Sequence, residues 1–176
     1  MRLFVSINLP ESFNSYLRNL QAELERSGTD LQHAGRKSGF HLTLFFLGEV
    51  PEGKIPELVD ELKKVQFKPF KLSFWDRLGS FQGRSVFVDL NKKGEGYEQL
   101  VNLQKKVLNM IERFGFRDER KFSPHITLSR VKSGIIDFSK IKVETQEFDV
   151  EAFYLMQSRL GAGGSEYEII EEFKSF

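Results

Sequence analysis

The sequence predicts an α+β protein of two similar lobes, each an antiparallel sheet with helices on its outer face. Segments with a period of two residues, typical of strands, alternate with segments of helical period. The order strand, helix, strand occurs twice, and each second strand opens with a near-identical string. The strings are His41–Leu44 (HLTL) and His125–Leu128 (HITL), 84 residues apart in a chain of 176. We therefore expect one bilobed domain over residues 1–176, built by internal duplication about an approximate twofold axis.

The first half contains a clear strand–helix–strand unit. Apolar residues alternate over 2–9, which predicts a strand, and recur at helical spacing over 11–27, where Pro10 suits the entry. The polar, glycine-containing stretch 28–39 predicts a loop. Residues 40–47 then predict the strand that carries the first string.

The rest of the chain repeats this order with an additional helix and additional strands. The same two periods predict, in sequence, a short helix after Pro51, strands over 69–75 and 84–90 joined by a loop, a helix over 95–114, a strand over 123–131, and closing strands over 147–157 and 166–173. The helix over 95–114 precedes the second string by the same interval as the first helix precedes the first string.

Composition narrows the classes of function. Lys and Arg number 26 against 25 Asp and Glu, giving a net charge of +1, so any contact with RNA must be local. The absence of cysteine excludes disulfides and thiolate metal sites and fits a reducing cytoplasm. The longest apolar run is far below the roughly 18 residues that span a membrane. The start of the chain also lacks the apolar core of a signal peptide. We expect a cytoplasmic monomer without a membrane or protein partner.

The paired strings suggest acid–base chemistry. Residues two apart on a strand share a face, so His41 lies with Thr43 and His125 with Thr127. A twofold axis would turn both faces toward one central cleft. One imidazole can then take a proton while the other gives one, and the hydroxyls can hold phosphate oxygens. A single string of this kind is usually structural. The matched pair, in a chain with three histidines and four threonines, favours a catalytic site that needs no metal.

Four stretches together carry a family resemblance. They are Arg2–Pro10 (RLFVSINLP), His41–Gly48 (HLTLFFLG), Ser123–Arg130 (SPHITLSR), and a closing pattern of Ser158, Leu160, Gly164 and Tyr167. The chain resembles the 2H phosphoesterase superfamily, which is named for two such His-x-Thr/Ser motifs. Within it, the chain is most similar to the RNA 2′,3′-cyclic phosphodiesterase family, also called the 2′-5′ RNA ligase family.

The resemblance implies hydrolysis of RNA 2′,3′-cyclic phosphate ends to 2′-phosphates, with no metal or other cofactor. His41 would be the general acid that protonates the departing 3′-oxygen, and His125 the general base that activates water. Thr43 and Thr127 would hold the phosphate. In reverse, the same site would join a 5′-hydroxyl to a cyclic phosphate through a 2′-5′ linkage.

Two alternatives stay open from the sequence. The first is a related phosphodiesterase that acts on a small cyclic phosphate, such as ADP-ribose cyclic phosphate, or on a 2′-5′ oligonucleotide. The second is a non-catalytic module that binds RNA ends. The intact His and Thr of both motifs argue against the second, because binding alone requires neither a proton donor nor a base.

Arg130 is a candidate phosphate anchor, because a guanidinium binds phosphate bidentately. Strict alternation puts it on the opposite face from His125, so a strand end or a bulge is required for it to enter the cleft. A surface ion pair is the alternative.

Two further contacts with substrate are considered. By alternation, Phe45 lies on the same strand face as His41 and Thr43, so it is a candidate for stacking on a nucleobase. The alternative is core packing, because the chain has 18 phenylalanines and most of them should be buried. Arg36 and Lys37, in the loop before the first motif, are either contacts to RNA phosphates or a solvated basic loop.

Overall fold

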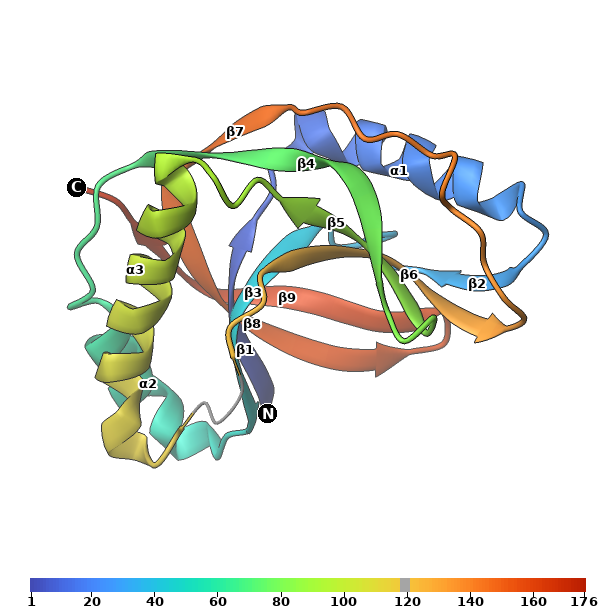
Figure 1. Ribbon diagram of the computed structural model, residues 1–176. Helices are drawn as coiled ribbons and strands as arrows, with labels where there is room; N and C mark the ends of the chain where they lie inside the picture. The colour runs from blue at the N-terminus through green and yellow to red at the C-terminus, as the bar shows by residue number, and fades with distance from the viewer. Residues whose placement is uncertain (118–120) are drawn as a thin grey trace.

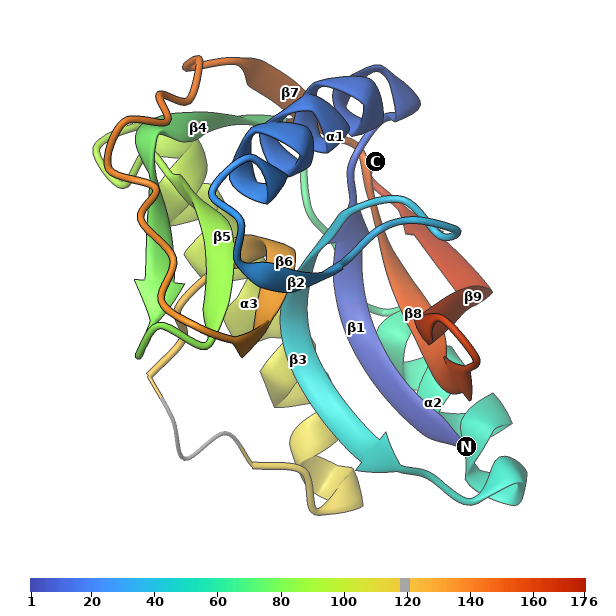
Figure 2. The same ribbon diagram turned by 90° about the vertical axis from the view of Figure 1, so that its right-hand side faces the viewer.

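A curled antiparallel sheet forms the centre of the fold, with helices packed along its sides (Figures 1 and 2). The computed structural model describes residues 1–117 and 121–176. The strands are β1 (Arg2–Asn8), β2 (Asp30–His33), β3 (His41–Glu49), β4 (Phe70–Phe81), β5 (Ser85–Leu90), β6 (His125–Ser133), β7 (Glu147–Val150), β8 (Ala152–Gly161) and β9 (Gly164–Lys174). The helices are α1 (Glu11–Glu25), α2 (Ile55–Leu62) and α3 (Glu95–Ile111), with short 3₁₀ turns at Glu52–Lys54 and Glu112–Phe114.

The strand order brings the two motif strands together. The order is β7-β4-β5-β6-β3-β1-β8-β9, and β2 pairs with β6 off this path. β3 and β6 are neighbours at the centre, where Leu42 lies opposite Ile126. The first residues of the two motifs therefore start side by side, although they are far apart in the sequence.

Each motif strand pairs with its outer neighbour in a corresponding way, β3 with β1 and β6 with β5. In β3, His41 and Thr43 pair with Asn8 and Ser6 of β1. In β6, the corresponding residues His125 and Thr127 pair with Asp89 and Phe87 of β5.

A bulge then interrupts both ladders at the equivalent place. Val5 lies opposite Phe45, and Val86 lies opposite Ser129, so Leu44 and Leu128 are extra residues. Beyond each bulge the alternation of faces is reversed.

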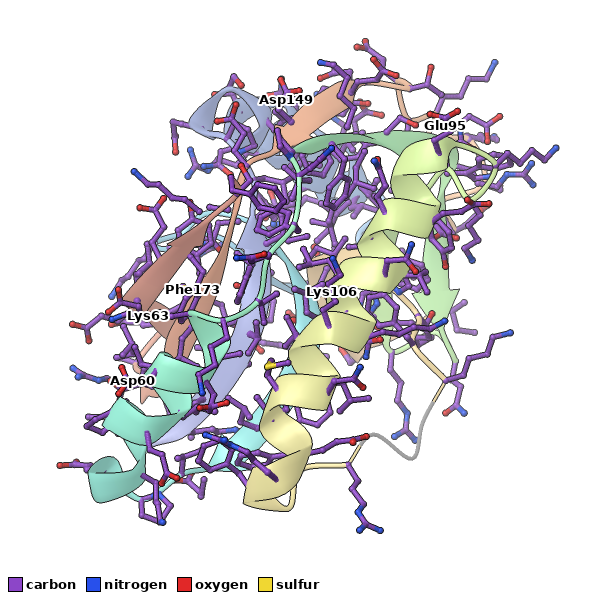
Figure 3. All side chains as sticks on the ribbon, turned by 90° about the vertical axis from the view of Figure 1, so that its left-hand side faces the viewer. Asp60, Lys63, Glu95, Lys106, Asp149 and Phe173 are labelled. Carbon is purple, nitrogen blue, oxygen red and sulfur yellow. The ribbon has the colours of Figure 1, made fainter. Side chains whose placement is uncertain are left out.

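The apolar residues of the motifs form part of the core, as the alternation predicts. Leu42, Leu44, Ile126 and Leu128 are all buried. On α1 the buried face consists of Leu17, Leu20 and Leu24, together with two amides, Asn14 and Gln21. α1 packs on β2 and β6, whereas α3 packs on α2, β3 and β4. Figure 3 shows α2 and α3 side by side on one side of the molecule, with charged side chains along their outer surface.

Three expectations about strands are wrong. The stretch 28–39 is not a continuous loop, because β2 is a short, half-buried strand without a clear alternation. β4 continues through the expected loop to Phe81, past an irregularity between Phe74 and Leu78. The expected strand 147–157 is two strands that break at Glu151, because β7 pairs with β4 whereas β8 pairs with β1.

Within the part of the chain that the structure describes, none of the helices is long and apolar enough to cross a membrane. The cytoplasmic location stays a prediction.

Candidate active site

Both motifs open into one cavity of about 470 Å³. His41, Thr43, His125 and Thr127 line it, and Arg130 lies at its edge with them. The strand pairing explains the meeting, because β3 and β6 are neighbours and each motif presents its His and Thr on one face. The volume is within the range of pockets that hold small ligands. The structure thus brings together five of the six residues predicted for the site.

His41 is enclosed by aromatic rings. Its imidazole centroid lies 5.0 Å from that of Phe4 and 4.8 Å from that of Tyr167, whose ring is nearly perpendicular to it. Burial, together with the smaller effect of the charge of nearby His125, lowers the pKa of His41 from 6.5 to about 4. The free protein therefore holds His41 as a neutral imidazole at neutral pH.

His125 has its own pair of aromatic neighbours and a fixed tautomer. Its ring centroid lies 4.8 Å from that of Phe81 and 5.1 Å from that of Phe87. Nδ1 lies 2.8 Å from the carbonyl oxygen of Ser123, and because a carbonyl only accepts, Nδ1 donates the hydrogen. In the neutral ring, Nε2 is then free of hydrogen and can accept a proton.

A glycine makes room for one of these rings. Gly79 lies opposite Phe87 in the β4–β5 ladder, and a Cβ added to it would lie 2.5 Å from the Phe87 ring. Any other residue at position 79 would displace the ring that packs against His125.

The bulge in β6 delivers Arg130 to the cavity. Because Leu128 is an extra residue, Arg130 falls on the same face as His125, whereas strict alternation along the sequence would put it on the opposite face. Within residues 1–117 and 121–176 Arg130 takes part in no ion pair, so the alternative of a surface ion pair is not supported there.

Helix α1 and strand β2 hold that bulge in place. The carbonyl oxygen of Leu128 accepts hydrogen bonds from the backbone N–H of Ala34 (2.8 Å) and from Nε2 of Gln21 (2.7 Å). The same Gln21 nitrogen lies 2.8 Å from the carbonyl oxygen of Ala34. His33, the third histidine, bridges Ser129 Oγ and Glu25 Oε1, each at 2.6 Å. His33 is thus a structural link to the bulge, and its side chain is only 5% exposed.

The predicted stacking role of Phe45 is wrong. The bulge at Leu44 turns Phe45 into the core, where it is 8% exposed and packs on Phe116. The next residue, Phe46, is 63% exposed and lines the cavity instead. Phe46 and Arg130 are equivalent positions, each two residues beyond the extra residue of a bulge.

Comparison with known proteins identifies the family. Residues 10–162 match the model of the 2′-5′ RNA ligase superfamily. The chain belongs to this family. An RNA 2′,3′-cyclic phosphodiesterase of Archaeoglobus fulgidus is 32% identical, over 99% of this chain and all of that protein. The family resemblance and the expectation that the chain is an enzyme are thereby confirmed.

Solved structures agree with this assignment. The protein TT0787 of Thermus thermophilus superimposes with a TM-score of 0.84 at 26% identity, covering 99% of this chain and 97% of that one. E. coli LigT complexed with 3′-AMP superimposes with a TM-score of 0.76 at 26% identity and the same coverage.

In this member of the 2′-5′ RNA ligase superfamily, the sequence did not indicate which residues surround the histidines. Phe4 and Tyr167 come from β1 and β9, near opposite ends of the chain, and no local pattern links them to His41. Tyr167 is further fixed by its backbone N–H, which donates to Ser38 Oγ at 2.9 Å. An amide at position 21, among the apolar positions Leu17, Leu20 and Leu24 of the helix, was the available signal for the support of the bulge.

The described residues contain no group of three or more His, Cys, Asp or Glu side chains placed to hold a metal ion. Metal-independent catalysis stays a prediction that the experiment below tests.

Proposed function

We propose that this protein hydrolyses RNA 2′,3′-cyclic phosphate ends to 2′-phosphates by two-histidine acid–base catalysis. The observation that carries the proposal is the single cavity lined by His41, Thr43, His125 and Thr127. The name of the A. fulgidus relative supports the same reaction, and the 3′-AMP complex of LigT supports a ribonucleotide ligand.

Each histidine has a separate task in the proposed reaction. Nε2 of His125 takes a proton from water, and the water oxygen attacks phosphorus. The bond between phosphorus and the 3′-oxygen breaks as His41 gives that oxygen a proton. The products are a 2′-phosphate and a 3′-hydroxyl. Hydroxyls of Thr43 and Thr127 donate hydrogen bonds to the non-bridging oxygens and stabilise the charge that develops there.

The low pKa of His41 sets a condition on this assignment. A general acid must hold a proton before it reacts, whereas His41 in the free protein is neutral. A bound phosphate anion beside the imidazole favours its charged form and raises its pKa. We therefore assign the protonation of His41 to the complex with the cyclic phosphate.

Two side chains complete the proposed binding of substrate. Arg130 anchors a phosphate oxygen through its guanidinium. Phe46 replaces Phe45 as the residue that stacks on the terminal nucleobase, because its ring is exposed at the cavity.

We propose that residues 1–176 form one bilobed domain that arose by internal duplication. The unit β1–α1–β3 corresponds to β5–α3–β6, with matching registers and a bulge at the same offset. This proposal puts the pseudo-twofold axis near Leu42 and Ile126, which lie opposite each other at the centre of the sheet. Both motifs lie in one chain, so a monomer is sufficient for the proposed site, and the same site run in reverse would form a 2′-5′ linkage.

The deciding experiment uses an RNA that ends in a 2′,3′-cyclic phosphate, incubated with the protein in EDTA. A 2′-phosphate product is expected, and the variants His41→Ala and His125→Ala should each lose at least about 10²-fold in kcat/KM. A 3′-phosphate product would contradict the assignment of the leaving oxygen, and strict metal dependence would contradict the mechanism.

The same assay separates the alternatives. Turnover confined to ADP-ribose cyclic phosphate or to 2′-5′ oligonucleotides would identify a related phosphodiesterase. Binding of the RNA end without turnover of any of these substrates would identify a binding module.

A further inference from the structure

A second hollow lies next to the active-site cavity, beside β2. It has a volume of about 220 Å³ and lies between the loop 34–38 and the turn that joins β8 to β9. Arg130 and Tyr167 line both this hollow and the active-site cavity, so the two spaces are adjacent. A third hollow of about 250 Å³ extends it outward to Lys132. We call the second and third hollows together the outer groove.

The outer groove is rich in positive charge, although the chain as a whole is close to neutral. Its lining includes Arg36, Lys37, Arg130 and Lys132. Glu166 also lines it, but this carboxylate is already paired with Lys37. Arg36 and Lys132 are exposed and make no ion pair in the described part of the chain.

Strand geometry arranges the donors of the groove in a row. Arg130 and Lys132 are two residues apart on β6, and both line the groove. Gln32 of β2 lies directly opposite Arg130 in the ladder, so its amide belongs to the same row. Arg36 adds a guanidinium from the loop that follows β2.

In the outer part of the groove, next to Lys132, the facing wall is mostly backbone. It is formed by the turn of Gly163 and Gly164, and a Cβ added to Gly164 would lie 2.7 Å from Nε2 of Gln32. Glycine is required there because its φ is +119° and because Gln32 packs against it. The turn therefore leaves the row of donors accessible along the groove.

We propose that the outer groove binds the sugar–phosphate backbone of single-stranded RNA on the 5′ side of the terminal nucleoside. This rests on the proposed function, because a cyclic phosphate closes the 3′ end and the chain can leave the cavity only in the 5′ direction. Arg36 and Lys132 contact the first phosphodiesters beyond the cavity. Their charges bind the phosphate backbone and do not distinguish base sequence. The groove makes the protein selective for RNA ends over mononucleotides.

The test compares two substrates with the same terminal nucleoside: a nucleoside 2′,3′-cyclic phosphate and a six-nucleotide single-stranded RNA that ends in it. The double variant Arg36→Gln/Lys132→Gln should lose about tenfold in kcat/KM on the RNA, mainly through KM, and nothing on the mononucleotide. The slope of log kcat/KM against log salt for the RNA should also become shallower by about 1.4, since two contacts to a single strand are removed.

A matched control removes two charges elsewhere. Lys63→Gln/Lys105→Gln changes exposed residues at the end of α2 and on α3, and Lys63 is seen on the outer side of α2 in Figure 3. This control should leave both substrates and the salt slope unchanged.

The outcomes distinguish the two levels of inference. If the wild-type protein turns over neither substrate, the proposed function fails. If it turns over both and the groove variant matches the control on the RNA, the groove is not the path of the backbone. An equal loss on both substrates would also overturn the proposal, because the two residues would then support the active-site cavity or the stability of the fold. Thermal unfolding of the variant distinguishes these two roles.

Discussion

At the scale of single residues, the surroundings of His41 and His125 make two identical side chains chemically different. Two aromatic rings enclose His41 and burial lowers its pKa, whereas a hydrogen bond to the carbonyl of Ser123 fixes the tautomer of His125. One imidazole is therefore poised to change its charge when an anion binds, and the other is oriented to accept a proton. The near-symmetric motifs thus differ through neighbours outside the motifs, and the tasks that we propose for the two histidines rest on this difference.

The lowered pKa of His41 predicts a specific dependence of stability on pH. Between pH 6.5 and about 4, the unfolded chain protonates this residue while the native protein does not, so native stability falls as the pH is lowered through this range. The loss due to His41 reaches about 3 kcal/mol at the acidic end. Urea unfolding of the wild type and of His41→Gln at pH 7 and pH 4.5 measures this loss of unfolding free energy. The wild type should lose more free energy of unfolding than the variant, and equal losses would mean that His41 is not held neutral.

Replacement by alanine should affect stability at Phe45 and RNA binding at Phe46. Phe45→Ala empties a core position, so it should cost about 3–5 kcal/mol of stability. Phe46→Ala changes an exposed ring and should leave stability within about 0.5 kcal/mol. It should instead weaken RNA binding by about 1–3 kcal/mol, the contribution of one stacked base. Chemical unfolding and KM on the cyclic-phosphate RNA, measured on both variants, check this crossed pattern; a KM effect of Phe45→Ala alone would contradict it.

At the scale of elements, the bulges decide which side chains enter the cavity. In β6 the bulge is held by Gln21 of α1, a residue 107 positions away from Leu128 in the sequence. No local pattern in β3 or β6 shows that alternation will reverse, and the residue that holds the β6 bulge lies in another element. This is why alternation put the two histidines and threonines on the face that lines the cavity but also put Phe45 there, where the structure has Phe46.

Replacement of Gln21 tests the support of the bulge. Gln21→Leu removes the donor to Leu128 and leaves its carbonyl with one partner, so we expect a loss of about 1–3 kcal/mol in stability. We also expect lower kcat/KM and a coupling to Arg130: Arg130→Gln should cost less in the Gln21→Leu background than in the wild type. A double-mutant cycle on the cyclic-phosphate RNA measures this coupling.

Asn14→Leu is the matched control for that cycle. Asn14 is also a buried amide on α1, but its Oδ1 accepts from the backbone N–H of Phe40, away from the β6 bulge. It should reduce stability without coupling to Arg130. Equal coupling in both cycles would show that Gln21 acts through general stability and not through the bulge.

At the scale of the whole molecule, the features predictable from sequence are those that periodicity and repetition encode. The three helices, the two motif strands and their apolar partners Leu42 and Ile126 follow from local spacing. The break at Glu151 does not, because it arises when β7 and β8 join opposite ends of the sheet. Tyr167 reaches His41 only through the order β3-β1-β8-β9, which periodicity leaves undetermined.

The central pairing of β3 and β6 predicts that the two proposed lobes unfold together. One continuous cluster of buried residues includes Leu42 and Ile126 at the junction, so there is no separate core for either lobe among the residues that the structure describes. Leu42→Ala should lower the free energy of unfolding by about 2–5 kcal/mol. Trp75, the single tryptophan, reports on β4, whereas far-ultraviolet circular dichroism reports on the whole chain. Both signals should shift together to lower denaturant in Leu42→Ala, as in a two-state transition. If the Trp75 transition separated from the circular dichroism transition, the lobes would be independent units and the proposal of one bilobed domain would be wrong.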